Sequence, residues 1–200
     1  MLMALTFVAP PALAARGKRD APPKTEIKRN RISVVHAGSG EKATNLLLIR
    51  KDPRTGLQHI RKPAKRRLQR LLRDRATNRE PQLPDNLLWY LYMVGRHFDK
   101  PIHLVSGLRQ KARKTSRHSQ GKAIDFRIPG VSSKTVWRYC KKRLAKKGVG
   151  LGGYPTSKFV HLDVREQSYY WIDDSGPGEP SRYRKGVRQP VEQWRLLRSR

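Results

Sequence analysis

Two short segments of the chain alternate apolar and polar residues with the period of a β-strand. In residues 123–128 the bulky apolar side chains fall on one face, and Asp125 falls on the other. In residues 159–164 the apolar side chains again share one face, and His161 and Asp163 share the opposite one. Successive side chains of a strand point to opposite faces of a sheet. If the two strands pair, Asp125 and His161 therefore stand side by side on one sheet surface.

Further strands are expected in the first half of the chain. Residues 32–35 and 45–49 are expected to form a hairpin around the glycines at 38–40. Residues 102–105, which follow a proline, form another expected strand. By contrast, we expect the glycine-rich residues 148–153 to form the loop that leads into the second polar strand.

Three helices are expected where apolar residues recur at intervals of three and four. The first begins at Pro63, whose fixed φ suits a first helical turn. Asp85 is expected to cap the second helix and Ser133 the third, which Gly148 ends. The chain's one cysteine, Cys140, falls on the apolar stripe of the third helix and is expected to be a small core residue. Together the elements predict an α+β fold, a small antiparallel sheet flanked by helices.

Composition divides the 200-residue chain into four parts. Residues 1–14 carry no charge and end in Ala-Leu-Ala, which predicts a signal peptide shortened at its positive start. A buried N-terminal segment is the alternative. Residues 15–30 are expected to be a disordered basic leader, and residues 31–172 a single folded domain. Residues 173–200 form a basic tail, rich in Gly and Pro, that either packs back on the domain or lies on an anionic surface.

The formal net charge of +30 predicts attraction to polyanions, namely nucleic acid, anionic lipid or an acidic cell envelope. A specific nucleic-acid binder is disfavoured, because the sequence shows no helix-turn-helix pattern and no aromatic residues interleaved on a basic sheet. The apolar N-terminus favours export instead, to the periplasm or cell envelope. No other segment is long and apolar enough to span a bilayer. We expect a monomer after cleavage of the signal.

A candidate metal site follows from the two polar strands. His118 lies seven residues before Asp125 and can reach it from the preceding loop, where Gly121 allows a tight turn. Together with His161 these residues offer two imidazoles and one carboxylate, a set that suits zinc. Three protein ligands leave a fourth position for water, which is the arrangement of catalytic zinc sites. We therefore predict one Zn²⁺ per chain.

Three motifs in this order resemble a known family. They are Ser106-Gly107-Leu108-Arg109, then His118 followed after six residues by Asp125, and then Phe159-Val160-His161-Leu162-Asp163. The combination resembles the M15 zinc peptidases, in particular the murein endopeptidase K-like branch. The resemblance runs from about residue 31 to 171. It implies a fold like that of the hedgehog and D-Ala-D-Ala peptidase proteins, and an exported, zinc-dependent endopeptidase that cuts peptidoglycan stem-peptide cross-links. A D,D-carboxypeptidase or a dipeptidase of the same superfamily is the alternative.

Three more residues are candidates for the site, and the resemblance implies the role of the first. Arg109 is implied to bind a carboxylate of the substrate peptide, which a guanidinium grips with two parallel hydrogen bonds. Ser116 is a candidate hydrogen-bond donor to the substrate. Asp163, on the same strand face as His161, is a candidate general base, and the equal alternative is that it orients His161 or pairs with a nearby arginine. Several relatives carry Glu or His two or three residues before the last ligand, where this chain has Lys158 and Phe159. A catalytically inactive protein that binds the cell wall or other envelope polyanions is therefore a second interpretation.

Overall fold

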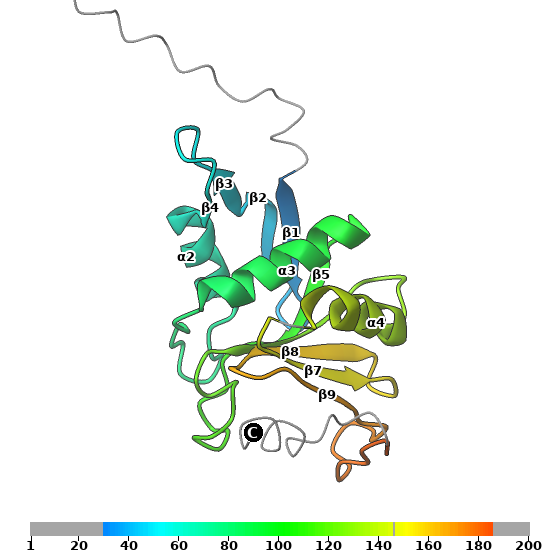
Figure 1. Cartoon of the computed structure of the whole chain (residues 1–200). Helices are drawn as coiled ribbons and strands as arrows, with labels where there is room; N and C mark the ends of the chain where they lie inside the picture. Colours follow the sequence, from blue (N-terminus) through cyan, green and yellow to red (C-terminus); the bar gives the residue numbers. More distant parts are fainter. Residues whose placement is uncertain (1–29, 146, 186–200) are drawn as a thin grey trace, which may run out of the picture.

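A mixed sheet of seven strands forms the centre of the protein in a computed structural model that describes residues 30–145 and 147–185 (Figure 1). In sheet order the strands are β2 (Lys42–Leu47), β1 (Arg31–His36), β5 (Ile102–Ser106), β6 (Ala123–Arg127), β8 (Phe159–Val164), β7 (Val149–Tyr154) and β9 (Tyr169–Ile172). A separate ribbon of two strands consists of β3 (Ile49–Lys51) and β4 (Gln58–Ile60). The helices are α2 (Lys62–Leu71), α3 (Asp85–Phe98) and α4 (Ser133–Leu144).

The α+β class predicted from the sequence is confirmed. The sheet is larger than expected, and two of its pairings, β1 with β5 and β7 with β9, are parallel. The pairings at the middle of the sheet, β5 with β6, β6 with β8 and β8 with β7, are all antiparallel. The two strands with alternating polarity, β6 and β8, are neighbours, as the pattern required.

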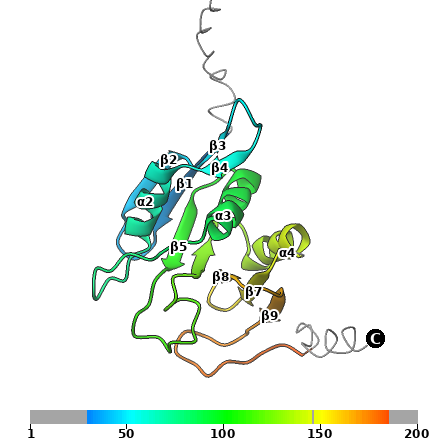
Figure 2. The same cartoon turned by 60° about the vertical axis from the view of Figure 1, so that its left-hand side comes forward.

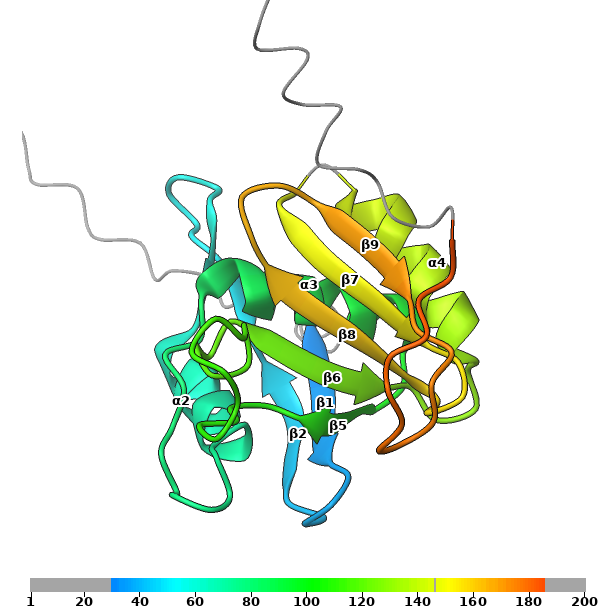
Figure 3. The ribbon, with the colours of Figure 1, turned by 90° about the horizontal axis from the view of Figure 1, so that it is seen from below.

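Among the described elements, α3 and α4 cover one face of the sheet, and neither helix covers the other, open face (Figures 1 and 3). The buried layer beneath them contains Phe126 and Leu162 from the strands and Leu88 and Val94 from α3, all fully buried. Burying one such side chain stabilises the fold by about 1.5–3 kcal/mol. Figure 2 shows α2 beside β2, the edge strand at the opposite end of the sheet from β9. The apolar faces of β6 and β8 are thus fixed toward the helices, and their polar faces point the other way.

All three helix starts lie one residue from the predicted positions, and α2 begins at Lys62 and not at Pro63. The hydroxyl of Ser132, not that of Ser133, caps α4 by accepting a hydrogen bond from the backbone N–H of Thr135. Pro84 occupies the capping position of α3, so Asp85 is its first helical residue and complements the helix dipole there. For α3 and α4 the predicted cap and the observed cap are adjacent residues, and the sequence alone does not fix a helix boundary to within one residue.

The glycine-rich segment before β8 is a strand and not the expected loop. Residues 149–154 form β7, which pairs with β8 on one side and with β9 on the other. Glycine is a weak strand former because it loses more backbone freedom than other residues. Here hydrogen bonds on both edges outweigh that cost, and the missing side chains leave space that neighbouring residues fill.

The described part of the tail packs back on the domain. Asp173 is 1% exposed, and its carboxylate accepts hydrogen bonds from the backbone N–H groups of Ser175 and Arg182. Asp173 also forms an antiparallel bridge with Tyr183. The expected signal peptide (1–14), the basic leader up to residue 29, and residues 186–200 lie outside the described residues. None of the described helices has the length and apolar character needed to cross a membrane.

Cys140 lies in the core, as predicted. Its side chain is fully buried on α4, and burial raises the pKa of its thiol to about 12. A thiol with such a pKa stays protonated at neutral pH and is a poor nucleophile.

Candidate metal centre

The strand register places one row of residues across the open face of the sheet. Asp125 on β6 is paired with His161 on β8 in the strand register. His161 is in turn paired with Gly152 on β7, and Gly152 with Trp171 on β9. Side chains of directly paired residues point to the same face. The alternation seen in the sequence therefore brings Asp125 and His161 together as predicted.

The loop before β6 brings His118 to the same place. Gly121 has a positive φ of 68°, which completes the turn between His118 and the strand. The Nδ1 atom of His118 lies 2.8 Å from the carbonyl oxygen of Gly107. Because a carbonyl can only accept, Nδ1 carries the hydrogen, and Nε2 is left to face the other two side chains.

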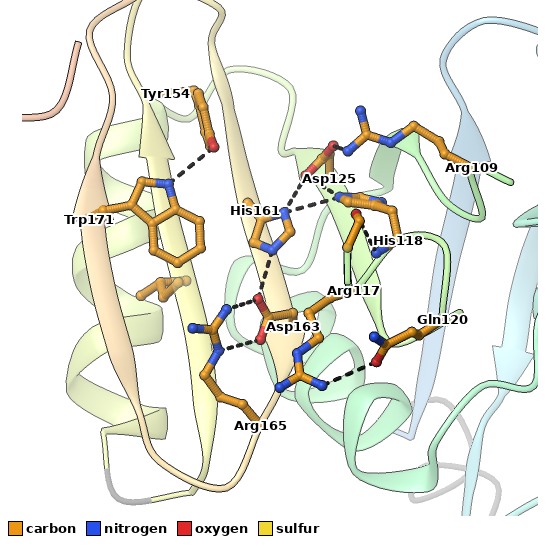
Figure 4. A network of polar contacts seen from close by, with 12 residues as sticks. Arg109, Arg117, His118, Gln120, Asp125, Tyr154, His161, Asp163, Arg165 and Trp171 are labelled. Carbon is orange, nitrogen blue, oxygen red and sulfur yellow. Dashed lines mark hydrogen bonds and ion pairs between the residues drawn. The ribbon is translucent and has the colours of Figure 1, made fainter. Parts of the chain in front are cut away.

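Three potential ligand atoms meet at one point beside the sheet (Figure 4). His118 Nε2 lies 3.1 Å from His161 Nδ1 and 3.3 Å from Asp125 Oδ1, and the last two atoms are 2.8 Å apart. Zinc binds such atoms at about 2.0–2.1 Å in a tetrahedron, which separates ligand atoms by about 3.3 Å. The three residues are only 3%, 5% and 8% exposed, in chain order. This buried cluster could hold a metal ion, and its donor set and spacing fit zinc.

Asp163 lies behind His161, on the side away from the other two candidate ligands. Its Oδ2 atom is 3.0 Å from His161 Nε2. Arg165 donates to both carboxylate oxygens, with Nε 2.7 Å from Oδ1 and with a second nitrogen on Oδ2. At 1% exposure, Asp163 is closed off from solvent. The hydrogen on His161 Nε2 is therefore held by Asp163, and Nδ1 faces Asp125.

Hydrogen bonds set the ionisation of the buried groups. Burial raises the pKa of Asp163, but hydrogen bonds from His161 and Arg165 outweigh it and lower the pKa to about 2. Burial raises the pKa of Asp125 as well, and hydrogen bonds from His118 and His161 hold it well below its usual value. Burial lowers the pKa of His161, but the two carboxylates beside it raise that pKa to about 9. Both carboxylates are therefore anionic at neutral pH, which suits cation binding, whereas His161 is protonated without a metal, so that metal binding would release a proton from its Nδ1 atom.

Two glycines of β7 make room for the groups that surround His161. A Cβ atom at Gly150 would collide with the carboxylate of Asp163 and the guanidinium of Arg165. A Cβ atom at Gly152 would lie 2.5 Å from Cε2 of Trp171, whose ring occupies that space. The indole ring of Trp171 is in turn 5.2 Å from the imidazole ring of His161, centre to centre. These glycines allow the neighbouring side chains to approach the backbone of β7 closely. From the sequence they were expected to provide the bends of a loop.

Arg109 and Ser116 both lie near the cluster. The Arg109 side chain is 53% exposed, and one of its terminal nitrogens is 3.7 Å from Asp125 Oδ2. The hydroxyl of Ser116 accepts a hydrogen bond of 3.3 Å from the backbone N–H of His118, so it braces the turn that carries this histidine. Their predicted contacts with a substrate stay predictions.

Arg165, Tyr154 and Trp171 surround the cluster but were not selected from the sequence. Trp171 Nε1 donates a hydrogen bond to the hydroxyl oxygen of Tyr154 (Figure 4). The sequence offered one indication of this arrangement. Gly150, Gly152 and Tyr154 alternate with the period of a strand. Without the register of β7 and β9, that signal does not place either aromatic ring beside His161.

A family model described as peptidoglycan L,D-endopeptidase MepK, of the M15 peptidases, matches residues 31–169. The chain belongs to this family. The resemblance to the M15 peptidases that the motifs indicated is thereby confirmed, and the match includes all three candidate ligands.

Curated relatives agree with the family assignment. Peptidoglycan L,D-endopeptidase MepK of Escherichia coli strain K12 is 33% identical over 114 residues, which cover 49% of this chain and 60% of the relative. A Haemophilus influenzae protein named probable peptidoglycan L,D-endopeptidase MepK is also 33% identical over 114 residues, covering 50% of this chain and 60% of the relative. The chain thus spans 60% of the length of these relatives. No solved structure gives a significant match.

Proposed function

We propose that the protein is a zinc-dependent endopeptidase that hydrolyses amide bonds in the stem-peptide cross-links of peptidoglycan. The observation that carries this proposal is the convergence of His118, Asp125 and His161 on one point, with a buried carboxylate behind His161. The MepK relatives support the substrate class, since their names state that they are peptidoglycan endopeptidases.

The three clustered side chains would hold the ion and leave one coordination position for water. Zinc in a site of this kind lowers the pKa of a bound water toward ~7 and polarises the scissile carbonyl. His118 and His161 present the nitrogen atoms that their hydrogen bonds to Gly107 and Asp163 leave available. Asp125 supplies a carboxylate oxygen and one negative charge.

Asp163 orients His161 in this proposal and is not the general base. A general base works best with a pKa near the operating pH, and the pKa of Asp163 is lowered to about 2. Both of its oxygens are already occupied by His161 and Arg165. A carboxylate that holds the second nitrogen of a ligand histidine fixes the ring and raises its basicity.

Arg109 is proposed to bind a carboxylate of the stem peptide. Its guanidinium is half exposed and touches Asp125 with one nitrogen at 3.7 Å, beyond ordinary hydrogen-bond distance. Most of its five N–H groups therefore stay available for a planar anion. Ser116 is proposed to assist from the same loop, where its hydroxyl already accepts from the His118 backbone.

The net charge and the expected cellular location agree with this proposal. Peptidoglycan presents free carboxylates, and a chain with a net charge of +30 is drawn to such a polymer. We propose that the protein is exported, acts in the periplasm as a monomer, and binds nucleic acid only through nonspecific charge.

Digestion of purified peptidoglycan sacculi tests this function. The mature protein is expected to release new muropeptides, detected by mass analysis, and a chelator should abolish the release until zinc is restored. The variant His161→Ala should lose activity and bound zinc together. His59→Ala, which alters a histidine on β4 away from the cluster, should keep both. An unchanged muropeptide profile with zinc bound would overturn the proposal.

A wall-binding protein without activity is the second candidate. It is favoured by one observation, that no side chain suited to a general base occupies the positions just before His161, where Lys158 and Phe159 stand. Zinc-loaded protein that sediments with sacculi but releases no muropeptide is the result that this candidate predicts. Release of single terminal D-alanine residues, or of dipeptides, would instead indicate the carboxypeptidase or dipeptidase alternatives.

A further inference from the structure

A pair of aromatic side chains holds a hydroxyl group at the edge of the metal centre. Tyr154, the last residue of β7, stacks on Phe159 with ring centres 4.3 Å apart and planes 15° from parallel. The Nε1 atom of Trp171 donates a hydrogen bond of 3.1 Å to the Tyr154 hydroxyl oxygen. The phenol is thus fixed at its ring by Phe159 and at its oxygen by Trp171, and Figure 4 shows the second of these contacts.

The open face of the sheet carries this hydroxyl close to the candidate ligands. Tyr154 and Phe159 are paired in the same register that pairs Gly152 with His161, two residues along each strand, so all these side chains share one face. The Trp171 ring bridges the gap, because it lies 5.2 Å from the His161 ring and bonds to Tyr154 at its other end. Burial raises the pKa of Tyr154, and the negative charges of Asp125 and Asp173 add to that rise.

The direction of the hydrogen bond between Trp171 and Tyr154 determines whether the Tyr154 hydroxyl can donate to a further group. An indole N–H can only donate, so the Tyr154 oxygen is the acceptor, and the phenolic hydrogen is left to be donated elsewhere. A phenol protonated at neutral pH is needed for that, and burial is the main cause that raises the pKa of Tyr154 to about 12. The site therefore presents one oriented O–H donor on the same face of the sheet as His161.

We propose that Tyr154 donates a hydrogen bond to the carbonyl oxygen of the scissile amide, and that Trp171 is a positioning residue for this donor. The inference rests on the proposed peptidase function. The carbonyl oxygen gains negative charge as the amide carbon becomes tetrahedral, and a fixed donor stabilises that charge more than it stabilises the starting amide. No proton is transferred in this role, and the phenol is unchanged after turnover.

Tyr154→Phe is the direct test, since it keeps the ring that stacks on Phe159 and removes only the hydroxyl. Loss of one such donor typically lowers kcat by about 10²–10³-fold. We expect a loss in this range in a cross-linked muropeptide assay, with KM and zinc content nearly unchanged. Tyr92→Phe is the matched control, because its hydroxyl donates to Asn30 on a different part of the domain, and it should keep wild-type kcat.

A binding measurement tests the same inference without turnover. A phosphinate analogue of the scissile amide mimics the tetrahedral, negatively charged intermediate, whereas the product peptides do not. Calorimetry of the zinc-loaded protein should show that Tyr154→Phe weakens phosphinate binding by about 10²-fold. The affinity for the product peptides should stay within about threefold of wild type. The variant removes a contact made to the charged tetrahedral state and not to the products.

Trp171→Phe supplies a second variant, which keeps an aromatic ring over Gly152 but cannot hold the Tyr154 oxygen. It should lower kcat less than Tyr154→Phe does, and the double variant should be no worse than Tyr154→Phe alone. Equal phosphinate affinity in wild type and Tyr154→Phe would overturn the inference, as would loss of zinc in Tyr154→Phe. A wild-type protein that digests no peptidoglycan would count against the proposed function, and the phosphinate comparison would still decide the role of Tyr154.

Discussion

At the scale of single residues, the centre depends on a buried chain of charge that runs from Arg165 through Asp163 to His161. Each link is a short polar contact, and Asp163 has no free oxygen. A buried charge is tolerated only when it is paired and hydrogen-bonded. This requirement explains why a carboxylate so close to the reaction centre is better suited to orienting His161 than to accepting a proton.

The variant Asp163→Asn separates those two roles. It preserves the size of the side chain but removes the charge that orients the His161 ring. We expect zinc affinity to fall about 10–100-fold, the usual cost of changing a residue behind a metal ligand. Saturating zinc should then recover much of the activity. Asp174→Asn, which alters an ion pair with Arg184 in the tail, serves as the control.

The result that would contradict the orienting role is equally specific. If Asp163→Asn binds zinc as tightly as wild type and yet stays inactive at every zinc concentration, Asp163 takes part in proton transfer. A competition titration against a chromogenic chelator measures the affinity, and the muropeptide assay measures the activity.

At the scale of elements, the loop between β5 and β6 is held by a carboxylate from the segment after α2. Asp74 accepts a hydrogen bond of 2.7 Å from the backbone N–H of Gln110, beside Arg109. It also accepts three bonds within its own turn, from Ala76 and from the backbone and hydroxyl of Thr77. The hydrogen bond from Gln110 is the main cause that lowers the pKa of Asp74 below its usual value.

This contact predicts a pH dependence of stability. Because the folded-state pKa of Asp74 is lowered, its contribution is present above its unfolded value of about 3.9 and is lost as the pH falls through the folded value. Asp74→Ala should therefore lower the free energy of unfolding by about 2–3 kcal/mol at pH 7, and by less at a pH well below the unfolded value of about 3.9. Denaturant titrations at the two pH values measure the difference.

A matched control for Asp74 lies in the hairpin between β3 and β4. Asp52 accepts from the backbone N–H groups of Arg54 and Thr55 in a similar turn, but its side chain bonds to no loop of the site. Asp52→Ala should leave peptidase activity intact, whereas Asp74→Ala should also raise KM by loosening Arg109. Equal losses from both variants at both pH values would contradict this account of the loop.

The close approach of Trp171 to Gly152 on β7 leads to a second prediction at this scale. A methyl group at Gly152 would press on the ring of Trp171, and overpacking of this kind costs about 1–3 kcal/mol. Gly152→Ala should therefore lower the melting temperature and reduce kcat, because Trp171 can no longer lie beside His161. Gly38→Ala is the control, since its added methyl group would come no closer than 3.4 Å to a neighbour. A fully active, fully stable Gly152→Ala protein would show that Trp171 does not depend on this space.

The elements also show where sequence reasoning succeeds and where it ends. Period-two alternation in β6 and β8 was enough to place Asp125 beside His161, because one face of each strand has to be buried. The same reasoning failed for β7, since glycine hides the alternation that side chains would reveal. Arg165 and Trp171 could not be placed, because their positions depend on which strands lie next to β7 and on space that glycines vacate.

At the scale of the whole molecule, the excess of positive charge bears on the partner that we propose and not on the fold. The chain has 45 Lys and Arg residues against 15 Asp and Glu. Several of the acidic residues are already paired, such as Glu41, whose carboxylate contacts both Arg73 and Arg75. The excess of 30 positive charges favours attraction to a polymer that carries many carboxylates.

Salt should therefore slow digestion of sacculi far more than cleavage of a small, uncharged peptide. Raising the salt from 0.1 M to 1 M shortens the screening length from ~10 Å to ~3 Å, which removes most long-range attraction. The rate of muropeptide release should fall at least about tenfold over this range. The small-peptide rate should change little. Equal salt sensitivity of both rates would mean that charge does not serve to capture the polymer.

The most direct measurement for the central claim is the zinc content of the purified protein and of its single-residue variants. Elemental analysis should give one zinc ion per chain for the wild type. His118→Ala, Asp125→Ala and His161→Ala should each lose it, and Arg109→Ala should retain it. Full zinc occupancy in any of the first three variants, or no zinc in a wild-type protein dialysed against zinc, would contradict the account.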